Sequence, residues 1–406
     1  MTVPITALCS LSLTVGLLAS VACSLCTYAF AQTAPAIDTT QPVAAPAMAL
    51  VLPNQQGIFA AAAEAVRQGF FTAHKASGST ATIQVIEVGD EIEQIGVALA
   101  AARDRGVRVA VGPLRRDQVN SIVEGGRAVL PLVTLNFPDR DASAPATMIA
   151  LGLSAEAEAE RVVQIALTSF INLRPGVSTG ARIMVVAGGG ALEKRIAQAY
   201  VNALRAAGEL PLTVEATPAE LARLGRQFET GTFDAVFLAL GAREASLVRP
   251  RIPRGVAVFG TSLLNVGDPT SSPAAAALAF DLEGVRFVDM PWLLQPDHPA
   301  VMVYPPPRSD ERRAGPSSSR PLAGGGREAT GGERILPMTL ETARLYALGI
   351  DAFRIAQVWM KGELRFEIEG VTGRLRVDRA QGVRVERVPV SAIYRNGAIE
   401  REEVAR

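Results

Sequence analysis

Apolar positions along this 406-residue chain follow two alternating rhythms. Short apolar runs such as "MALVLP" and "VRVAVGP" are typical of buried strands, whereas the segment between Gly57 and Ala76 spaces its apolar residues three and four apart. There, Phe59, Ala63, Val66 and Phe70 fall on one helical face. Strand and helix patterns alternate in this way up to about residue 150, which predicts right-handed βαβ units on a parallel sheet.

A second run of the same kind follows. It opens with a helix capped by Ser154 and continues through strand patterns such as "ARIMVVAGGG" and "DAVFLALG". Two runs of similar size predict an α/β protein with two lobes, each a parallel sheet flanked by helices. We divide this part of the chain into lobe 1 (48–152), lobe 2 (153–262), a return or hinge segment (263–303), an insertion (304–337) and a C-terminal helix and strands that complete the lobes (338–406).

Two features of the C-terminal part support this division. Residues 304–337 are dense in Pro, Gly, Ser and charge, and they cannot bury enough apolar surface to order themselves, so we predict a disordered insertion. Near the end of the chain, Asn396-Gly397 between two strand patterns predicts a β-hairpin.

The N-terminus carries a secretory pattern. An apolar stretch ends in Ala29-Phe30-Ala31, so we predict a signal peptide over residues 1–31, followed by an Ala/Pro/Thr-rich flexible leader over 32–47. All the cysteines of the chain (Cys9, Cys23 and Cys26) precede this cleavage site. An alternative is lipidation at Cys23 within "ASVAC", although Ser20 stands where such sites usually have Leu.

Composition argues against several classes of function. Lys plus Arg equals Asp plus Glu, at 40 each, so nothing indicates a nucleic-acid footprint. The two histidines, His74 and His298, form no metal-binding pattern with the cysteines, and neither a G-x-S-x-G elbow nor a Cys nucleophile occurs after residue 31. We therefore expect no enzyme, no cofactor and no metal.

Some charged and glycine-rich motifs allow two interpretations. Gly188-Gly189-Gly190 lies between a strand and a helix, where phosphate cradles occur, but it lacks the Lys-Ser/Thr of a P-loop, which favours a plain tight turn. Arg115 and Arg116 at a helix start can hold an anion or form an exposed first turn. We interpret the Arg-rich "VRVERV" as a solvated face.

The stretch "DLEGVRFVDMPWLL" is the most unusual in a chain poor in aromatics. Its strand pattern ends in Asp289 and breaks at Met290-Pro291, beside Trp292, one of only two tryptophans. Such a set of residues suits a catalytic site, a ligand clamp, a surface for another protein or a buried hinge. Asp289 has no evident second carboxylate or histidine for acid–base work.

These residues also carry a resemblance. "LVLPNQQGIFAAAAEAVRQGFFTAH" resembles the first strand and helix of type I periplasmic binding proteins. "DAVFLALGAREASLVRPRI", "DMPWLL", "RLYALGIDAFRIAQ" and "GVTGRLRVD" resemble the penicillin-binding protein activator family (LppC/LpoA). The resemblance implies a two-lobe fold whose chain crosses between the lobes three times at a hinge. Pro291 and Trp292 then become hinge residues, with a direct part in binding as the alternative.

The same resemblance implies a function. It is that of a non-enzymatic, periplasmic activator of a class A penicillin-binding protein in peptidoglycan synthesis, with anchoring to the outer membrane as a further expectation. The alternative is a solute-binding protein of an ABC transporter that takes an amino acid or similar small ligand; a peptidoglycan fragment is another candidate ligand. In this fold the carboxyl ends of the strands face the cleft. The predicted cleft residues are Asn54, Gln55, Gly112, Pro113, Thr134, Asn136, Ser154, Gly189, Thr261, Ser262 and Asp289.

Overall fold

The computed structural model describes residues 47–91, 93–126, 128–168, 181–230, 233–306 and 339–403. The predicted signal peptide with Cys23, nearly all of the predicted leader and, from residue 307 on, the predicted insertion lie outside these ranges. The described residues belong to one compact unit, Ala44–Arg406. Among them, no helix is both long enough and apolar enough to cross a membrane.

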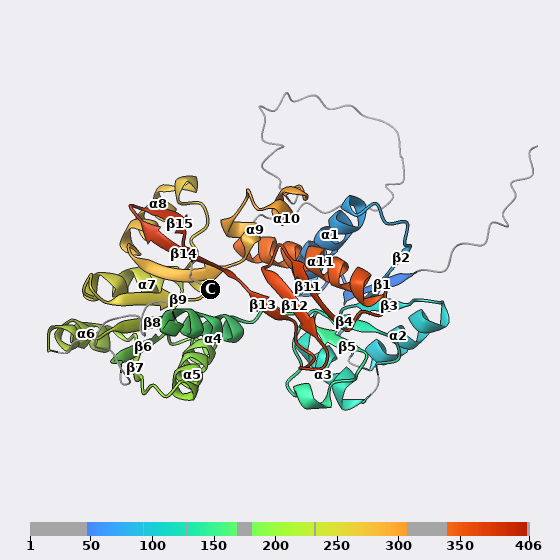
Figure 1. Cartoon of the computed structure of the whole chain (residues 1–406), viewed down its shortest axis with the longest axis horizontal. Coiled ribbons are helices and arrows are strands. Elements are labelled where there is room, and N and C mark those ends of the chain that lie inside the picture. Colours follow the sequence, from blue (N-terminus) through green and yellow to red (C-terminus); the bar gives the residue numbers. More distant parts are fainter. Residues whose placement is uncertain are drawn as a thin grey trace, which may run out of the picture. The chain divides into compact units, whose positions relative to one another are not determined.

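Five parallel strands form the first sheet, in the order β2-β1-β3-β4-β5 (Figure 1). Strands and helices alternate along the chain, as the apolar pattern predicts. The elements are β1 (Met48–Pro53), α1 (Ala60–Ala76), β2 (Ile83–Val88), α2 (Gln94–Asp104), β3 (Val109–Val111), α3 (Arg116–Glu124), β4 (Leu132–Thr134), the 3-10 turn η1 (Asp141–Ser143) and β5 (Met148–Ala150). Every residue of β1 is buried, because both faces of this sheet are covered.

Seven strands form the second sheet, in the order β15-β14-β10-β9-β8-β6-β7. Its elements are α4 (Ala155–Ala166), β6 (Ile183–Ala187), α5 (Ala191–Ala206), β7 (Leu212–Glu215), α6 (Pro218–Thr230), β8 (Ala235–Ala239), α7 (Ala242–Val248), η3 (Arg249–Arg251), β9 (Ala257–Gly260), η4 (Ser262–Leu264), η5 (Pro269–Ser271), α8 (Pro273–Asp281), β10 (Val285–Asp289), β14 (Val390–Arg395) and β15 (Ala398–Arg401). The Ser154 hydroxyl caps α4 by accepting from the Ala157 amide at 3.1 Å, as predicted.

The second sheet is parallel except at one edge. There β14 runs antiparallel to β10, and β15 runs antiparallel to β14. The turn between these two strands holds Asn396 at φ 51° and Gly397 at φ 73°, which confirms the predicted hairpin, since such a turn needs positive φ at both central residues. The C-terminal strands thus complete the sheet as an antiparallel addition.

The remaining elements connect the two large sheets. They are α9 (Pro291–Leu294), α10 (Pro299–Met302), α11 (Leu340–Trp359) and a small antiparallel sheet of β11 (Arg365–Glu369), β12 (Arg374–Asp378) and β13 (Glu386–Val388). The chain passes between the large sheets three times: from β5 to α4, from β10 to α9, and through β13 into β14. The third passage lies beside the first, because the Ala150 amide donates to the Val383 carbonyl and the Val385 amide to the Ala150 carbonyl.

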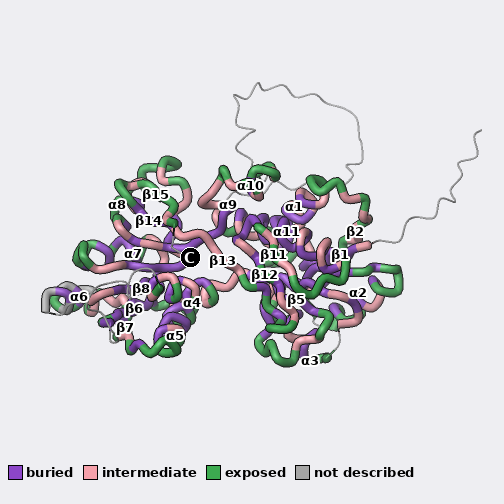
Figure 2. The backbone as a smooth tube through the Cα atoms, viewed as in Figure 1, coloured by how far each residue is buried: buried purple, intermediate pink, exposed green. Residues whose placement is uncertain are grey.

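Apolar clusters cover both faces of each large sheet. In the first sheet, α1 and α11 pack on one face and α2 and α3 on the other. In the second, α4 and α5 pack on one face and residues of α6, α7 and α8 on the other. Figure 2 shows the buried residues concentrated along the strands and along α11.

Helices α1 and α11 approach each other backbone to backbone. A Cβ atom on Gly69 would lie 1.9 Å from the Tyr346 carbonyl oxygen, and one on Gly349 would lie 2.1 Å from the Val66 carbonyl oxygen. Only glycine fits at these two positions. Gly349, the glycine of "LYALGIDAF", therefore allows α11 to pack directly against α1.

Candidate functional site

Arg344 of α11 binds the carboxyl end of β10. Its Nη2 donates to Asp289 Oδ2 at 2.6 Å and to the Ser262 carbonyl at 3.1 Å, and its Nε donates to Asp289 Oδ1 at 3.3 Å. Asn265 Nδ2 and the Met290 amide donate to the same carboxylate, both at 2.8 Å. The oxygens of Asp289, which is 1% exposed, are therefore occupied within the protein.

The surroundings of Arg344 favour its charged form. Burial by itself would lower the pKa of Arg344, but hydrogen bonds and attraction from Asp289, with further attraction from Glu158 and Glu341, raise this pKa overall. A buried cation is tolerated because the carboxylate pairs with it.

Glu158 of α4 makes a second buried ion pair near the same place. Its Oε2 accepts from the Ser262 amide at 3.2 Å, and its Oε1 pairs with Arg387 Nη2 of β13, also at 3.2 Å. We call Glu158, Ser262, Asn265, Asp289, Arg344 and Arg387 the polar network. Through Ser262, it joins α4, the end of β10, α11 and the third passage of the chain.

Asp351, further along α11, holds the turn between β11 and β12. It accepts from the amides of Val371 and Thr372 at 3.1 and 2.8 Å, and from the Thr372 hydroxyl at 2.7 Å. The Trp292 amide donates to the Val371 carbonyl at 2.9 Å, and the Trp292 ring packs 5.3 Å from the Tyr346 ring. The motifs "DMPWLL", "RLYALGIDAF" and "GVTG" therefore meet at one junction.

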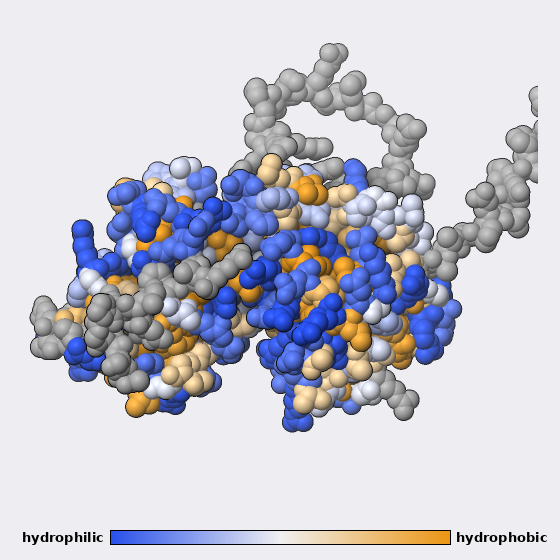
Figure 3. Space-filling view, in the orientation of Figure 1, coloured by the Kyte–Doolittle hydropathy of each residue, from blue (hydrophilic) through white to orange (hydrophobic). Residues whose placement is uncertain are grey.

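A pocket with about 830 Å³ of empty space, open to solvent, lies between α4 and the third passage of the chain. We call it the α4–β13 groove. It is lined by Phe137, Gly152, Ser154, Ala157, Glu158, Glu160, Arg161, Gln164, Arg384, Val385, Glu386, Arg387 and Pro389. Two buried donors in this wall have no hydrogen-bond acceptor: Nη1 of Arg387 and Nε of Arg161. The small sheet β11–β13 beside it shows mostly hydrophilic side chains on its outer face (Figure 3).

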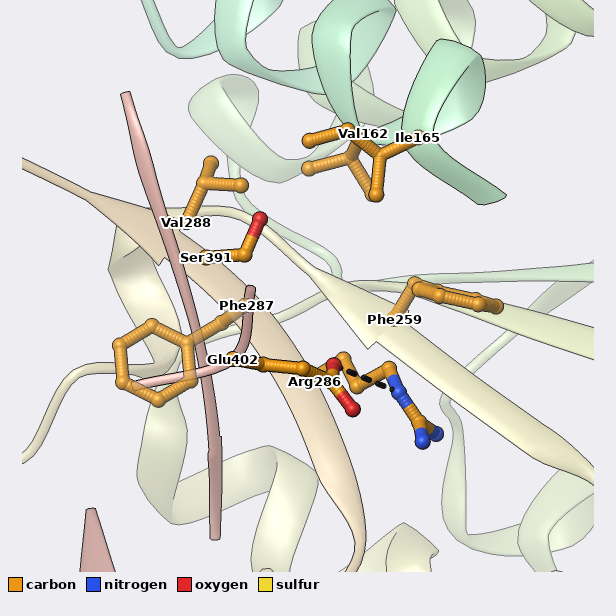
Figure 4. Close-up of a pocket in the computed structure, with 8 residues that line it drawn as sticks. All are labelled: Val162, Ile165, Phe259, Arg286, Phe287, Val288, Ser391 and Glu402. Atoms are coloured by element: carbon orange, nitrogen blue, oxygen red, sulfur yellow. Dashed lines mark hydrogen bonds and ion pairs between the residues drawn. The ribbon is translucent and has the colours of Figure 1, made fainter. Parts of the chain in front are cut away.

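A second, smaller pocket has a different character. It lies between α4 and the second sheet, holds about 220 Å³ of empty space and is lined mostly by apolar side chains. In Figure 4, Val162 and Ile165 of α4 lie opposite β9 and β10, and Arg286 pairs with Glu402 at 2.9 Å beside them. Because its two charged members, Arg286 and Glu402, are paired with each other, we interpret it as a packing gap.

The predicted cleft residues of the first sheet bond mainly to their own neighbourhood. Asn54 Oδ1 accepts from the Gly57 amide at 3.1 Å, and Gln55 donates to Glu87 at 2.7 Å. Thr134 is fully buried, with its hydroxyl 2.9 Å from the Asn136 carbonyl. Asn136 in turn donates to the Leu114 carbonyl at 3.2 Å.

The remaining residues of that edge are held by backbone contacts. The Pro113 carbonyl accepts from the Leu135 amide at 3.0 Å. Gly112 packs against β1, since a Cβ there would lie 2.0 Å from the Val51 carbonyl oxygen.

The predicted residues of the second sheet divide into three sets. Ser262 and Asp289 come together in the polar network, and Ser154 lines the α4–β13 groove. Thr261 is fully buried with its hydroxyl oxygen unpartnered, and Gly189 is exposed with nothing within 4 Å of the place of a Cβ. Whether these residues bind a ligand stays a prediction.

Sequence reasoning missed the arginines of the site. The interpretation of "VRVERV" as a solvated face is wrong for Arg387, whose side chain is 9% exposed. A signal was present in the alternation: Val383 and Val385 are buried while Arg384 and Glu386 are exposed, and Arg387 shares the parity of the buried set. Arg344 and Glu158 gave no such local signal. Among the described residues, no cluster of three or more His, Cys, Asp or Glu side chains suits a metal ion.

Comparison with solved structures identifies the fold class of the chain. A putative branched-chain amino acid ABC transporter from Chromobacterium violaceum matches with a TM-score of 0.65 and 29% identity, over 85% of this chain and 99% of that one. The C-domain of LpoA (YraM) from Haemophilus influenzae, a regulator of PBP1A, matches with a TM-score of 0.63 and 21% identity, over 88% and 99%. The fold is thus the expected two-lobe, type I periplasmic-binding-protein-like fold.

Comparison at the level of sequence gives the family likeness. The model of the LppC family, "LppC putative lipoprotein", matches residues 28–223, which confirms the resemblance to the LppC/LpoA family. The penicillin-binding protein activator LpoA of Photobacterium profundum is 30% identical over 118 residues, which are 29% of this chain. The matched segment covers 19% of that relative's length.

Proposed function

We propose that this chain is a non-enzymatic regulator of the periplasm that activates a class A penicillin-binding protein in peptidoglycan synthesis. The observation that carries the proposal is the LppC match over residues 28–223, together with the likeness to a penicillin-binding protein activator. Three of the motifs that suggested the family from the sequence, "DMPWLL", "RLYALGIDAFRIAQ" and "GVTGRLRVD", also meet at one junction in the fold, around Asp351 and Trp292.

The geometry of the expected ligand cleft favours a regulator over a solute receptor. A receptor for an amino acid needs one group for the carboxylate and one for the ammonium of its ligand. The candidate for the ammonium, Asp289, is already saturated by Arg344, Asn265 and a backbone amide. An ammonium ligand would have to displace a charge-assisted pair and leave the Arg344 cation buried without its carboxylate, which is unfavourable.

A purified class A penicillin-binding protein tests the proposal directly. We expect added protein to raise the rate of peptidoglycan cross-linking with a saturable dependence on its concentration. The control is the same protein after thermal unfolding. No stimulation, together with no binding of the synthase in a pull-down, would remove the activator function.

A solute-binding protein for a branched-chain amino acid is the second candidate. It is favoured by the Chromobacterium violaceum likeness, which extends over 99% of that chain. Calorimetric titration with leucine, isoleucine and valine decides between the two candidates. Micromolar binding of one of them without stimulation of the synthase would support the receptor.

Anchoring to the outer membrane rests on Cys23 and is a separate matter. Labelling with a radioactive fatty acid in cells, with Cys23→Ser as the control, tests it. Label on the natural chain that is lost in the variant would support a lipid anchor.

A further inference from the structure

The α4–β13 groove contains two arginine donors that the protein leaves without acceptors. Arg387 is nine-tenths buried, and while its Nη2 pairs with Glu158, its buried Nη1 has no partner. Arg161 of α4 donates from Nη1 to Gln164 at 2.9 Å, but its buried Nε also lacks a partner. We propose that this groove binds a small monoanionic carboxylate through Nη1 of Arg387 and Nε of Arg161.

The energetic argument concerns unpaired buried donors. A buried donor without an acceptor has lost its hydrogen bonds to water and gained none in return, and the cost is larger for a charged group, so native proteins leave few such donors. Here two such donors belong to Arg161 of α4 and Arg387 of β13, and both residues line one groove that opens to solvent. An oxygen-rich ligand that fills the groove would give both donors an acceptor and remove this cost.

The charges around the groove select the type of anion. Its wall also contains Glu158, Glu160 and Glu386, which balance the charge of its three arginines, so the groove offers a phosphate dianion no net positive charge. A carboxylate presents two oxygens, one for each of the two guanidinium donors, and such hydrogen bonds between charged partners are stronger than neutral ones. Any ammonium group on the same ligand would lie among these glutamates.

Arg384 also lines the groove, but we do not expect it to bind the ligand because its own partners already hold it. It pairs with Asp141 at 2.6 Å and lies over the Phe137 ring at 4.8 Å from its centre, so it forms part of the rim. Of the predicted cleft residues, only Ser154 lines the groove. The site is therefore separate from the strand ends where the fold would place a ligand, and the inference goes beyond the proposed function and does not depend on it.

Binding there would join two parts of the chain. Arg161 belongs to α4 of the second sheet. Arg387 belongs to the third passage, whose preceding residues Val383 and Val385 bond to the backbone of Ala150 at the edge of the first sheet. A bound carboxylate would bridge them and stabilise their present arrangement. Binding of a small molecule in the groove would thus favour the present arrangement of the two large sheets.

Arginine side-chain NMR of the purified protein tests the proposal. The Nε–H signals are followed while sodium acetate, alanine or inorganic phosphate is added at constant ionic strength. We expect saturable shifts of the Arg161 and Arg387 signals with acetate and alanine, and much weaker shifts with phosphate. Arg161→Ala should weaken acetate binding by roughly tenfold or more, because it removes one charge-assisted bond.

Two further variants make the result decisive. Arg205→Ala removes an exposed arginine at the end of α5 and should leave binding unchanged. Arg387→Lys keeps a charge opposite Glu158 but loses the second donor branch, and should weaken binding as Arg161→Ala does. No saturable shift with either carboxylate, equal binding in Arg161→Ala, or phosphate binding as tight as acetate would each overturn the proposal.

Discussion

Arg344 and Arg387 belong to one polar network and each pairs with a buried carboxylate, but the two arginines are used differently. Arg344 bonds Asp289 twice and Ser262 once, and none of its buried donors is left without an acceptor. Arg387 bonds Glu158 once and leaves Nη1 unpaired beside a groove that opens to solvent.

This difference distinguishes polar groups that hold the fold together from polar groups that can still bind a ligand. A carboxylate whose lone pairs are all taken fixes the arrangement of the elements around it and has nothing left for a ligand. A guanidinium with an unpaired buried donor has lost the water that would hydrate this donor and has gained no hydrogen bond in its place. In this fold, the end of β10 is therefore a structural joint, whereas the groove beside β13 is a candidate site.

The largest expected effect comes from breaking the saturated pair. Asp289→Ala leaves Arg344 buried without its carboxylate and leaves the Asn265 amide unpaired. We expect a loss of about 3–5 kcal/mol in the free energy of unfolding, measured with urea. Asp297→Ala, at an exposed position, is the control and should stay within about 0.5 kcal/mol of the natural protein. A loss below about 1 kcal/mol for Asp289→Ala would show that the pair is not a structural joint.

A smaller loss is expected at the unsaturated pair. Glu158→Gln keeps an oxygen that can accept from the Ser262 amide but removes the charge opposite Arg387. Because Arg387 makes one hydrogen bond to Glu158, whereas Arg344 makes two to Asp289, we expect about 1.5–3 kcal/mol of destabilisation in urea. The matched control is Glu160→Gln, at an exposed position of α4, which should be nearly neutral. If Glu158→Gln cost as much as Asp289→Ala, the contrast between the two arginines would fail.

The fold could be predicted from the sequence because its signals are local. Strand and helix periods, the Ser154 cap and the Asn396-Gly397 turn each depend on residues within a few positions of one another. The antiparallel edge of the second sheet could not be predicted in this way. Hairpin chemistry identifies two neighbouring strands but does not say which sheet they join.

The polar network could not be predicted from local patterns either. Arg344 and Asp289 are 55 residues apart, and Arg387 and Glu158 are 229 apart, so no local pattern links them. Asp289 is recognisable because it ends a strand, but the arginine that saturates it lies in a helix whose apolar residues dominate the pattern. Only the burial of Arg387 could have been predicted from the sequence, because in a strand it points to the same side as the buried Val383 and Val385.

The junction around Asp351 extends the comparison to a carboxylate held by two backbone amides, a hydroxyl and the partly exposed Arg354, whose Nη1 donates to Asp351 Oδ1 at 3.3 Å. Thr372→Val removes the hydroxyl that donates to Asp351 at 2.7 Å while the two backbone amides remain. We expect a loss of about 1–2 kcal/mol in urea unfolding, below that of Asp289→Ala. Thr213→Val on exposed β7 is the control and should be neutral or slightly stabilising. A Thr372→Val loss as large as that of Asp289→Ala would mean that the hydroxyl, and not the amides, holds the turn.

The smallest effect is expected at a pair whose carboxylate, Asp117, is exposed. Arg115 donates from Nε to Asp117 Oδ1 at 3.1 Å, and this hydrogen bond lowers the pKa of Asp117 below its ordinary value. The carboxylate then contributes stability above the pKa of the unfolded chain, and this contribution is lost as the pH falls through the lowered pKa. In Arg115→Gln, carbon-13 NMR should show the pKa of Asp117 move upward, with less than about 1 kcal/mol lost at neutral pH. Arg105→Gln, at the end of α2, should leave the Asp117 titration unchanged. An unchanged pKa in Arg115→Gln would mean that the helix start, rather than Arg115, sets the charge of Asp117.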